Sequence, residues 1–254
     1  MSMNTESINV PKLSLGRRLR WWASDVVNVA RGALPSAIAP RSRNLRMGPL
    51  QLDAIQKCVA WLNDYIGKPH PELGRNGDIC PFVRTALRKQ RMSFVVADHI
   101  THADRVGIKS LVMFEAWRLL QHLDENDRFA ELVTTNILFP ELKGEAESIL
   151  HDVHSETKSS LMRRGVMIAA FFPGYEKPAI YNDNFKLYKS PFPVLVVRPM
   201  ALHDIMFLTG DSEAFGEYHR RFAARYHAGT VSDEFGYPAR FTEAERRFGL
   251  TEAV

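Results

Sequence analysis

The amino-acid sequence predicts an α/β domain, in which helices cover a single sheet of about four or more strands, with an N-terminal helical arm before it. Short apolar runs rich in branched and aromatic residues, typical of buried strands, alternate with longer stretches whose apolar residues recur every three or four positions, as on a helix. The 254-residue chain is 45% hydrophobic and 24% charged, which is ordinary for a globular protein that buries its own core. Long helices between successive strands imply one sheet covered by helices.

The first part of the chain, residues 1–48, is expected to form a basic arm and a linker, and residues 49–254 the α/β domain. Basic residues outnumber acidic ones in the arm, whereas the rest of the chain is close to neutral. Over residues 13–34, apolar side chains recur at helical spacing and arginines occupy the other side, which predicts an amphipathic helix. Such a helix suits packing on the protein's own body, binding to a membrane surface or organelle targeting, and the sequence leaves these alternatives open.

Each element of the domain has its own signals along the chain. The first helix carries apolar residues at helical spacing and stops at Gly67, and Asp104 is suited to cap a later helix. Pro140 ends the second strand, and Gly165 ends the helix that follows it. The predicted helices are 50–66, 85–90, 104–123, 145–164, 201–208 and 213–227, and the predicted strands are 93–98, 129–139, 166–172 and 194–197.

Composition and missing motifs narrow the class of protein. The two cysteines, Cys58 and Cys80, are too few for a disulfide framework, and no apolar run approaches the roughly 20 residues of a membrane span. With no secretory signal at its start, the chain is expected to be soluble and cytoplasmic. It lacks the glycine motifs of nucleotide-binding loops and the serine elbow of hydrolases. Because the basic charge stops near residue 50, a nucleic-acid partner is not expected.

The first candidate site is the loop over residues 69–84, which is rich in glycine and proline. Cys80 precedes a predicted helix, whose amino end lowers a thiol pKa, and Arg75 and Arg84 add positive charge. Its thiolate is suited to be a nucleophile, a metal ligand or a haem ligand, and the alternative is a small buried residue. His70 is a candidate substrate-binding residue or a plain loop residue.

A second candidate loop, residues 172–182, follows a hydrophobic strand. Open α/β sheets place ligands in the loops that leave the carboxyl ends of their strands. Tyr175, Lys177, Tyr181 and Asn182 are therefore candidate polar groups of a ligand site. The alternative is an ordered loop of stacked aromatic side chains.

A third candidate segment, residues 198–204, follows the last strand. Arg198 is suited to hold a carboxylate or a haem propionate in a bidentate way. His203, which Asp204 follows, is a candidate axial ligand or base. Cys80 and His203 are thus the candidate metal ligands.

Two pairs of histidines have the spacing that places both on one face of a helix, and each pair could begin a metal site. Zinc takes three or four ligands, and neither pair has an evident third ligand nearby in the sequence. These pairs are His99 with His102 and His151 with His154.

The order of motifs over residues 78–227 resembles the YqcI/YcgG family. A Cys-Pro loop leads into an Ala-Leu helix and a strand, a strand ends in Phe-Phe-Pro-Gly, and a proline-bracketed strand precedes an arginine-rich helix. Some members of that family are haem-dependent enzymes that N-hydroxylate amino acids such as arginine in small-molecule biosynthesis. The chain departs from the family where a His-Pro pair is expected, because it has Gly174 and Tyr175 after Pro173.

The resemblance implies a haem-dependent monooxygenase that acts on an amino acid or a similar small polar molecule, with a redox partner. Cys80 or His203 would ligate the iron, and Tyr175 would lie over the reacting site. Arg75 and Arg198, with Arg84, would hold the haem propionates or a substrate carboxylate. The alternative is a non-catalytic module that binds a ligand or a protein, and that could attach to a membrane surface through residues 13–34. Association into a homo-oligomer is a separate possibility that the sequence leaves open.

Overall fold

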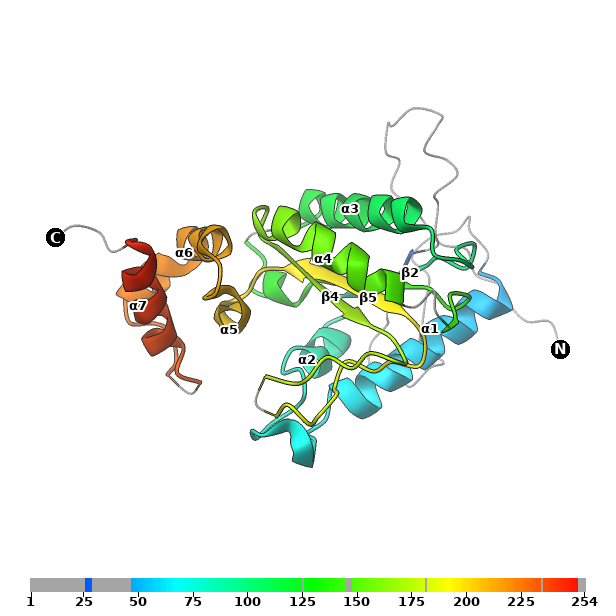
Figure 1. The fold of residues 1–254 in the computed structure, drawn as a ribbon, viewed down its shortest axis with the longest axis horizontal. Helices are drawn as coiled ribbons and strands as arrows, with labels where there is room; N and C mark the ends of the chain where they lie inside the picture. The colour runs from blue at the N-terminus through cyan, green and yellow to red at the C-terminus, as the bar shows by residue number, and fades with distance from the viewer. Residues whose placement is uncertain are drawn as a thin grey trace.

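The computed structural model describes residues 26–28, 47–124, 126–144, 148–180, 182–233 and 235–250 (Figure 1). Its sheet has five strands in the order β1-β2-β3-β5-β4. Strands β2 and β3 are parallel, and every other neighbouring pair is antiparallel. The predicted α/β class is therefore confirmed, as a mixed sheet. The strands are β1 (Val26–Asn28), β2 (Met92–Val96), β3 (Thr134–Leu138), β4 (Val166–Phe171) and β5 (Val194–Pro199).

The elements agree with most of the ranges expected from the sequence, and the differences include the start of β3 and a helix at the end of the described chain. The strand expected from residue 129 begins only at Thr134, because residues 130–132 form a 3-10 turn. A last helix, α7, was not expected. The helices are α1 (Pro49–Trp61), which continues as the π-helical turn η3 (Leu62–Ile66), α2 (Val83–Arg88), α3 (Arg105–Gln121), α4 (Ile149–Met162), α5 (Ile205–Leu208), α6 (Ser212–His227) and α7 (Tyr237–Phe248), with 3-10 turns η4 (Pro71–Leu73), η5 (Ala130–Leu132) and η7 (Leu202–Asp204).

The sheet is covered on both faces, which explains why β2, β4 and β5 are largely apolar along their length. Helices α3 and α4 lie above the sheet in Figure 1 and α1 lies below it. Because successive side chains of a strand point to opposite faces, Val95 joins the core under α3, and Phe94 joins the core over α1. The lower face also carries Asn136, Ala169 and Val196, which are cross-strand partners.

A third core follows strand β5 at one end of the molecule, where α5, α6 and α7 pack together (Figure 1). Its largest buried side chains include Phe215, Tyr218 and Phe241. Helix α7 carries Tyr237, Phe241 and Ala244 at helical spacing between Gly236 and Gly249, both with positive φ. These helix signals are interrupted by many charged residues, and the sequence-based ranges stopped at residue 227.

The basic arm is described only at residues 26–28, where the backbone forms β1, antiparallel to β2. The helix expected over residues 13–34 is therefore wrong at these three positions. The rest of that segment lies outside the described residues. No helix in the described part of the chain is long and apolar enough to cross a bilayer.

Candidate functional site

An apolar cavity of about 200 Å³ lies against the lower face of the sheet, beneath the loop that contains Cys80. Side chains from α1, the sheet and α5 form its walls, among them Trp61, Phe171 and Phe207. The polar groups that reach it include Cys80, Asn136, Arg198 and His203. An apolar cavity with a few convergent polar groups is the usual form of a small-molecule site. We refer to it as the Cys80 cavity.

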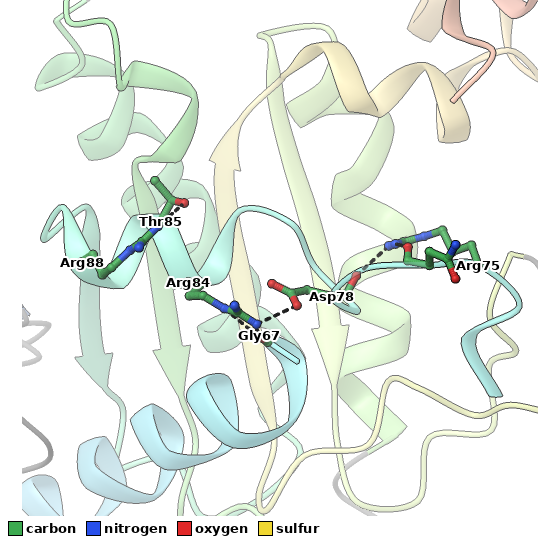
Figure 2. Close-up of polar contacts among 7 residues, drawn as sticks. Gly67, Arg75, Asp78, Arg84, Thr85 and Arg88 are labelled. Atoms are coloured by element: carbon green, nitrogen blue, oxygen red, sulfur yellow. Dashed lines mark hydrogen bonds and ion pairs between the residues drawn. The ribbon is translucent and has the colours of Figure 1, made fainter. Parts of the chain in front are cut away.

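The loop before Cys80 is fixed by its own two arginines (Figure 2). Arg75 donates hydrogen bonds to the carbonyls of Asn76, Asp78 and Ile79, over distances of 2.9, 2.9 and 3.0 Å. Arg84 binds the Asp78 carboxylate at 2.8 Å and the Gly67 carbonyl at 3.0 Å. These guanidinium groups hold the loop together, and the cofactor-binding role expected for both stays a prediction.

Cys80 is half-buried, with its sulfur at the wall of the cavity. Its backbone N–H donates to the Ile66 carbonyl at 2.9 Å, which anchors the loop to η3. Burial raises the pKa of the Cys80 thiol, whereas N–H groups of Phe82 and Val83 that donate to the sulfur, and the nearby Arg198, lower it. The net direction is upward, so the group is a thiol near neutral pH, because burial opposes its ionisation more than these neighbours favour it.

His203 lines the same cavity from the segment after β5. Its Nδ1 lies 2.5 Å from the Tyr237 hydroxyl, and its ring meets those of Phe82 and Phe207 edge to face. Burial lowers the pKa of His203, which favours the neutral imidazole. Its Nε2 has no hydrogen-bond partner among the residues that the structure describes, so it is suited to act as a base or a ligand.

Arg198 has a protein partner of its own. Its two terminal nitrogens lie 2.8 and 2.5 Å from the two carboxylate oxygens of Asp204, which is fully buried. Phe82 covers the guanidinium at 5.6 Å. Arg198 thus holds the carboxylate of Asp204, whereas the sequence led us to expect a ligand carboxylate or a propionate.

A second cavity, of about 130 Å³, lies beside the first and shares Ala169, Val196 and Arg198 with it. Four consecutive residues of β4, from 167 to 170, line it, because β4 is the last strand of the sheet. We refer to it as the basic hollow, because its other side chains include Lys158, Lys177 and His154.

The charges around the basic hollow act on one another. Burial, and then the neighbouring Lys158, lower the pKa of Lys177. No ion pair is recorded for either lysine in the described ranges, although Lys177 lies 5.1 Å from the ring of Tyr188. Burial, and then Lys177 and Lys158, also lower the pKa of His154, to about 4. An anion that entered the hollow would relieve this repulsion.

We predict that His154 makes the protein less stable in mild acid. Its pKa is about 4 in the fold and near 6.5 when unfolded, so unfolding takes up a proton between these values. The contribution of neutral His154 to the free energy of unfolding is complete above about pH 6.5. It falls by about 1–3 kcal/mol as the pH drops toward 4. Urea unfolding at pH 7.5 and 4.5 should show a smaller loss for His154→Gln than for the wild type. An equal loss in His154→Gln would contradict this account, and His122→Gln, at an exposed position, is the control.

Tyr175 lines the basic hollow and is not among the described residues that line the Cys80 cavity. Its ring stacks on Phe172 at 4.3 Å and tilts against Tyr188 at 5.9 Å. This arrangement matches the alternative of an ordered aromatic loop. Lys177 lines the same hollow, so the second loop contributes to a cavity next to Cys80.

The other candidate residues hold the two loops against each other. His70 stacks on Phe185 at 4.3 Å, and its Nδ1 accepts from the Glu72 N–H. Asn182 donates to the Glu72 carbonyl at 2.8 Å. Tyr181 lies outside the described residues. Among the described residues, neither pair of histidines spaced three apart gathers a third metal ligand.

The two cysteines are expected to differ strongly in reactivity. Cys58 is fully buried in the core over α1, and burial raises the pKa of its thiol far above the ordinary value. Cys80 is reachable from its cavity. Iodoacetamide should therefore label one thiol in the native protein and two in denaturant, and Cys80→Ala should remove the native label. Equal rates for the two native thiols would contradict this assignment.

Sequence reasoning missed Asn136 and Lys158. Asn136 is buried in the middle of β3 and donates to the Ser93 carbonyl at 3.2 Å while reaching the Cys80 cavity. The signal was a polar residue within an apolar strand, which is unusual unless it is bonded. Lys158 carried no signal, because a lysine on a polar helix is ordinary.

Comparison with known proteins gives one match. A family model described as a domain of unknown function matches residues 55–233. The match includes strands β2 to β5 and the three candidate segments, which are residues 69–84, 172–182 and 198–204. No curated protein and no solved structure shows a significant match.

Proposed function

Because the chain belongs to the DUF6875 family, a domain of unknown function, its role has to be argued from its own site, and we propose that it binds a small molecule in the Cys80 cavity. One observation carries the proposal. Cys80, Asn136 and His203, which are far apart in the sequence, reach one apolar cavity. Convergence of polar groups on an apolar cavity is what ligand recognition requires.

The specific form of this proposal is a haem whose iron is ligated by the sulfur of Cys80. Metal binding deprotonates a thiol, and the N–H groups of Phe82 and Val83 already point at the sulfur that would carry the charge. The walls beside it are apolar and aromatic. A haem held by a thiolate supplies oxygen activation, which is the chemistry that the likeness to the YqcI/YcgG family implies. His203 would provide a neutral imidazole in the same cavity.

Two observations limit the fit of a haem. Arg84 and Arg198 are each paired with a carboxylate of the protein, which leaves Arg75, whose partners are backbone carbonyls and which lines the cavity, as the arginine able to hold a propionate. The cavity of about 200 Å³ accepts a small ligand as it stands, whereas a porphyrin is larger. The rim carries Ile180 and Phe207, which are exposed, and these side chains would have to move outward.

The basic hollow suggests which substrates would enter. An amino acid carries a carboxylate, and Lys158 and Lys177 offer ammonium groups for it beside the Cys80 cavity. The remainder of such a molecule would then point toward Cys80 and His203. We therefore propose a small molecule that carries a carboxylate, such as an amino acid, as the substrate class.

Two measurements test the proposal at its two levels. Haemin titrated into the purified protein should give a saturable Soret band with one haem per chain, and a protein that takes up no haem would exclude the haem form. An apolar fluorescent probe should bind the cavity in either case. Ala169→Leu, which narrows the cavity, should weaken probe binding, whereas Ala224→Leu on the exposed side of α6 should not. Equal probe binding by both variants would exclude the cavity itself.

A further inference from the structure

We propose that His219, His227 and Glu245 form a zinc site that joins α6 to α7. The Glu245 Oε1 atom lies 2.8 Å from the Nε2 atoms of both histidines. The three atoms all lie within 4.8 Å of one another. This cluster belongs to the third core, and none of its members lines the Cys80 cavity or the basic hollow, so the inference is independent of the proposed function.

The two histidines converge although the helix does not bring them together. His219 and His227 are eight residues apart, which is about 12 Å along the axis of α6. Their ring centroids are nevertheless only 6.2 Å apart. Both side chains lean along the helix toward Glu245 on α7, and both direct Nε2 at the same oxygen.

Aromatic packing fixes the orientation of the two rings. Phe241 stacks on His219 with a centroid distance of 5.4 Å and meets His227 edge to face at 5.9 Å. Glu245 follows Phe241 by one turn on the buried side of α7. A metal site needs ligands that are held in place before the ion arrives, and this packing provides them.

The donor set suits zinc. Two imidazole nitrogens and one carboxylate oxygen are the protein ligands of a common type of zinc site, in which the fourth position stays open. Donors around a tetrahedral zinc lie about 3.3 Å apart for bonds of about 2.0–2.1 Å. The two Nε2–Oε1 separations of 2.8 Å would lengthen slightly on binding, and the two Nε2 atoms, which lie within 4.8 Å of each other, would take up a separation of about 3.3 Å.

One ligand of the proposed site is buried and another is partly exposed, which gives the ion both a fixed position and a path from solvent. Glu245 is buried, and a buried carboxylate is costly unless opposite charge or hydrogen bonds compensate it. The side chain of His227 is 45% exposed, which leaves a path for the ion and for a bound water. Without an ion, the two imidazoles would simply donate to the carboxylate, and the experiment has to separate these two states.

The test is zinc binding to untagged, full-length protein that has been treated with a chelator. Calorimetric titration with Zn²⁺ should show one site per chain. Co²⁺ should give the visible absorption bands of a four-coordinate centre. Loss of an outer hydrogen-bond partner weakens metal binding by about 10- to 100-fold, so His227→Ala and Glu245→Gln, which remove ligands, should weaken it more.

His122→Ala is the matched control, because His122 is also exposed near the end of a helix and its ring bonds to the Arg118 carbonyl. It should bind Zn²⁺ as the wild type does. Protein that binds no Zn²⁺, or that keeps its affinity in His227→Ala, would overturn the proposal. His227 is largely exposed, so this variant remains informative even if Glu245→Gln does not fold.

Discussion

Asp204→Ala is expected to destabilise the protein by about 3–5 kcal/mol, because it leaves the charge of Arg198 half-buried without a partner. Asp204 is fully buried and holds both terminal nitrogens of Arg198. It also accepts the Ala201 N–H at 2.7 Å, which starts the turn before α5. The substitution therefore removes the link between the end of β5 and the third core. Urea unfolding at neutral pH measures the loss directly.

Two comparisons show whether burial is the cause. Glu213→Ala removes an exposed ion pair with Arg163 and should cost no more than about 1 kcal/mol. Replacing Arg198 and Asp204 together by methionine and leucine should cost less than Asp204→Ala alone, because no charge is then left unpaired. An Asp204→Ala protein as stable as Glu213→Ala would show that the pair contributes nothing.

The second large effect is expected from Cys80→Ala, which should abolish the thiolate type of haem spectrum. If the sulfur ligates the iron, the reduced carbon monoxide complex of the wild type should show the red-shifted Soret band that marks thiolate ligation. The variant should lose that band and most of its haem, because alanine offers no ligand. Absorption spectra of the two proteins at equal protein concentration, each mixed with the same amount of haemin, provide the measurement.

Cys58→Ala is the matched control, since it removes the other thiol of the chain from a buried position away from the cavity. It should keep the spectrum of the wild type. His203→Ala separates the two candidate ligands. A haem complex whose spectrum is unchanged in Cys80→Ala but altered in His203→Ala would move the ligand to the imidazole.

The fold was predictable where burial decides the local pattern. Strands β2, β4 and β5 are covered on both faces, so each is a nearly unbroken apolar run that the sequence shows directly. Helix α7 was missed because its buried residues stand among many charged ones, and its packing partners in α6 decide its structure. Tertiary contacts with α6, which no local sequence pattern contains, therefore determine that these residues form a helix.

The candidate site was predictable by segment more than by role. The loop of Cys80 and the segment of His203 do reach one cavity. The arginines were assigned to a ligand, but each found a partner in the protein, and Asp204 lay only six residues from Arg198. The partner of a charged side chain depends on which oxygen atoms the fold buries beside it. The sequence alone therefore does not distinguish a protein carboxylate from a ligand carboxylate as the partner.

The proposed zinc site could not be predicted from the sequence. His219, His227 and Glu245 have no short spacing of the kind that marks known zinc motifs. Their meeting depends on how α6 crosses α7 and on the ring of Phe241 between them. Only the packing of two helices makes them neighbours.

The place of β4 at the rim of the sheet has a consequence for self-association. A strand in this position offers unpaired backbone groups to any other strand, and proteins often guard such strands with lysine. Lys158 and Lys177 stand beside β4, so a second copy that docked there would bring two more ammonium groups to the same spot. Like charges oppose that polymerisation. The lysines that would attract a substrate carboxylate would thus also oppose edge-to-edge pairing of β4 between two copies of this chain.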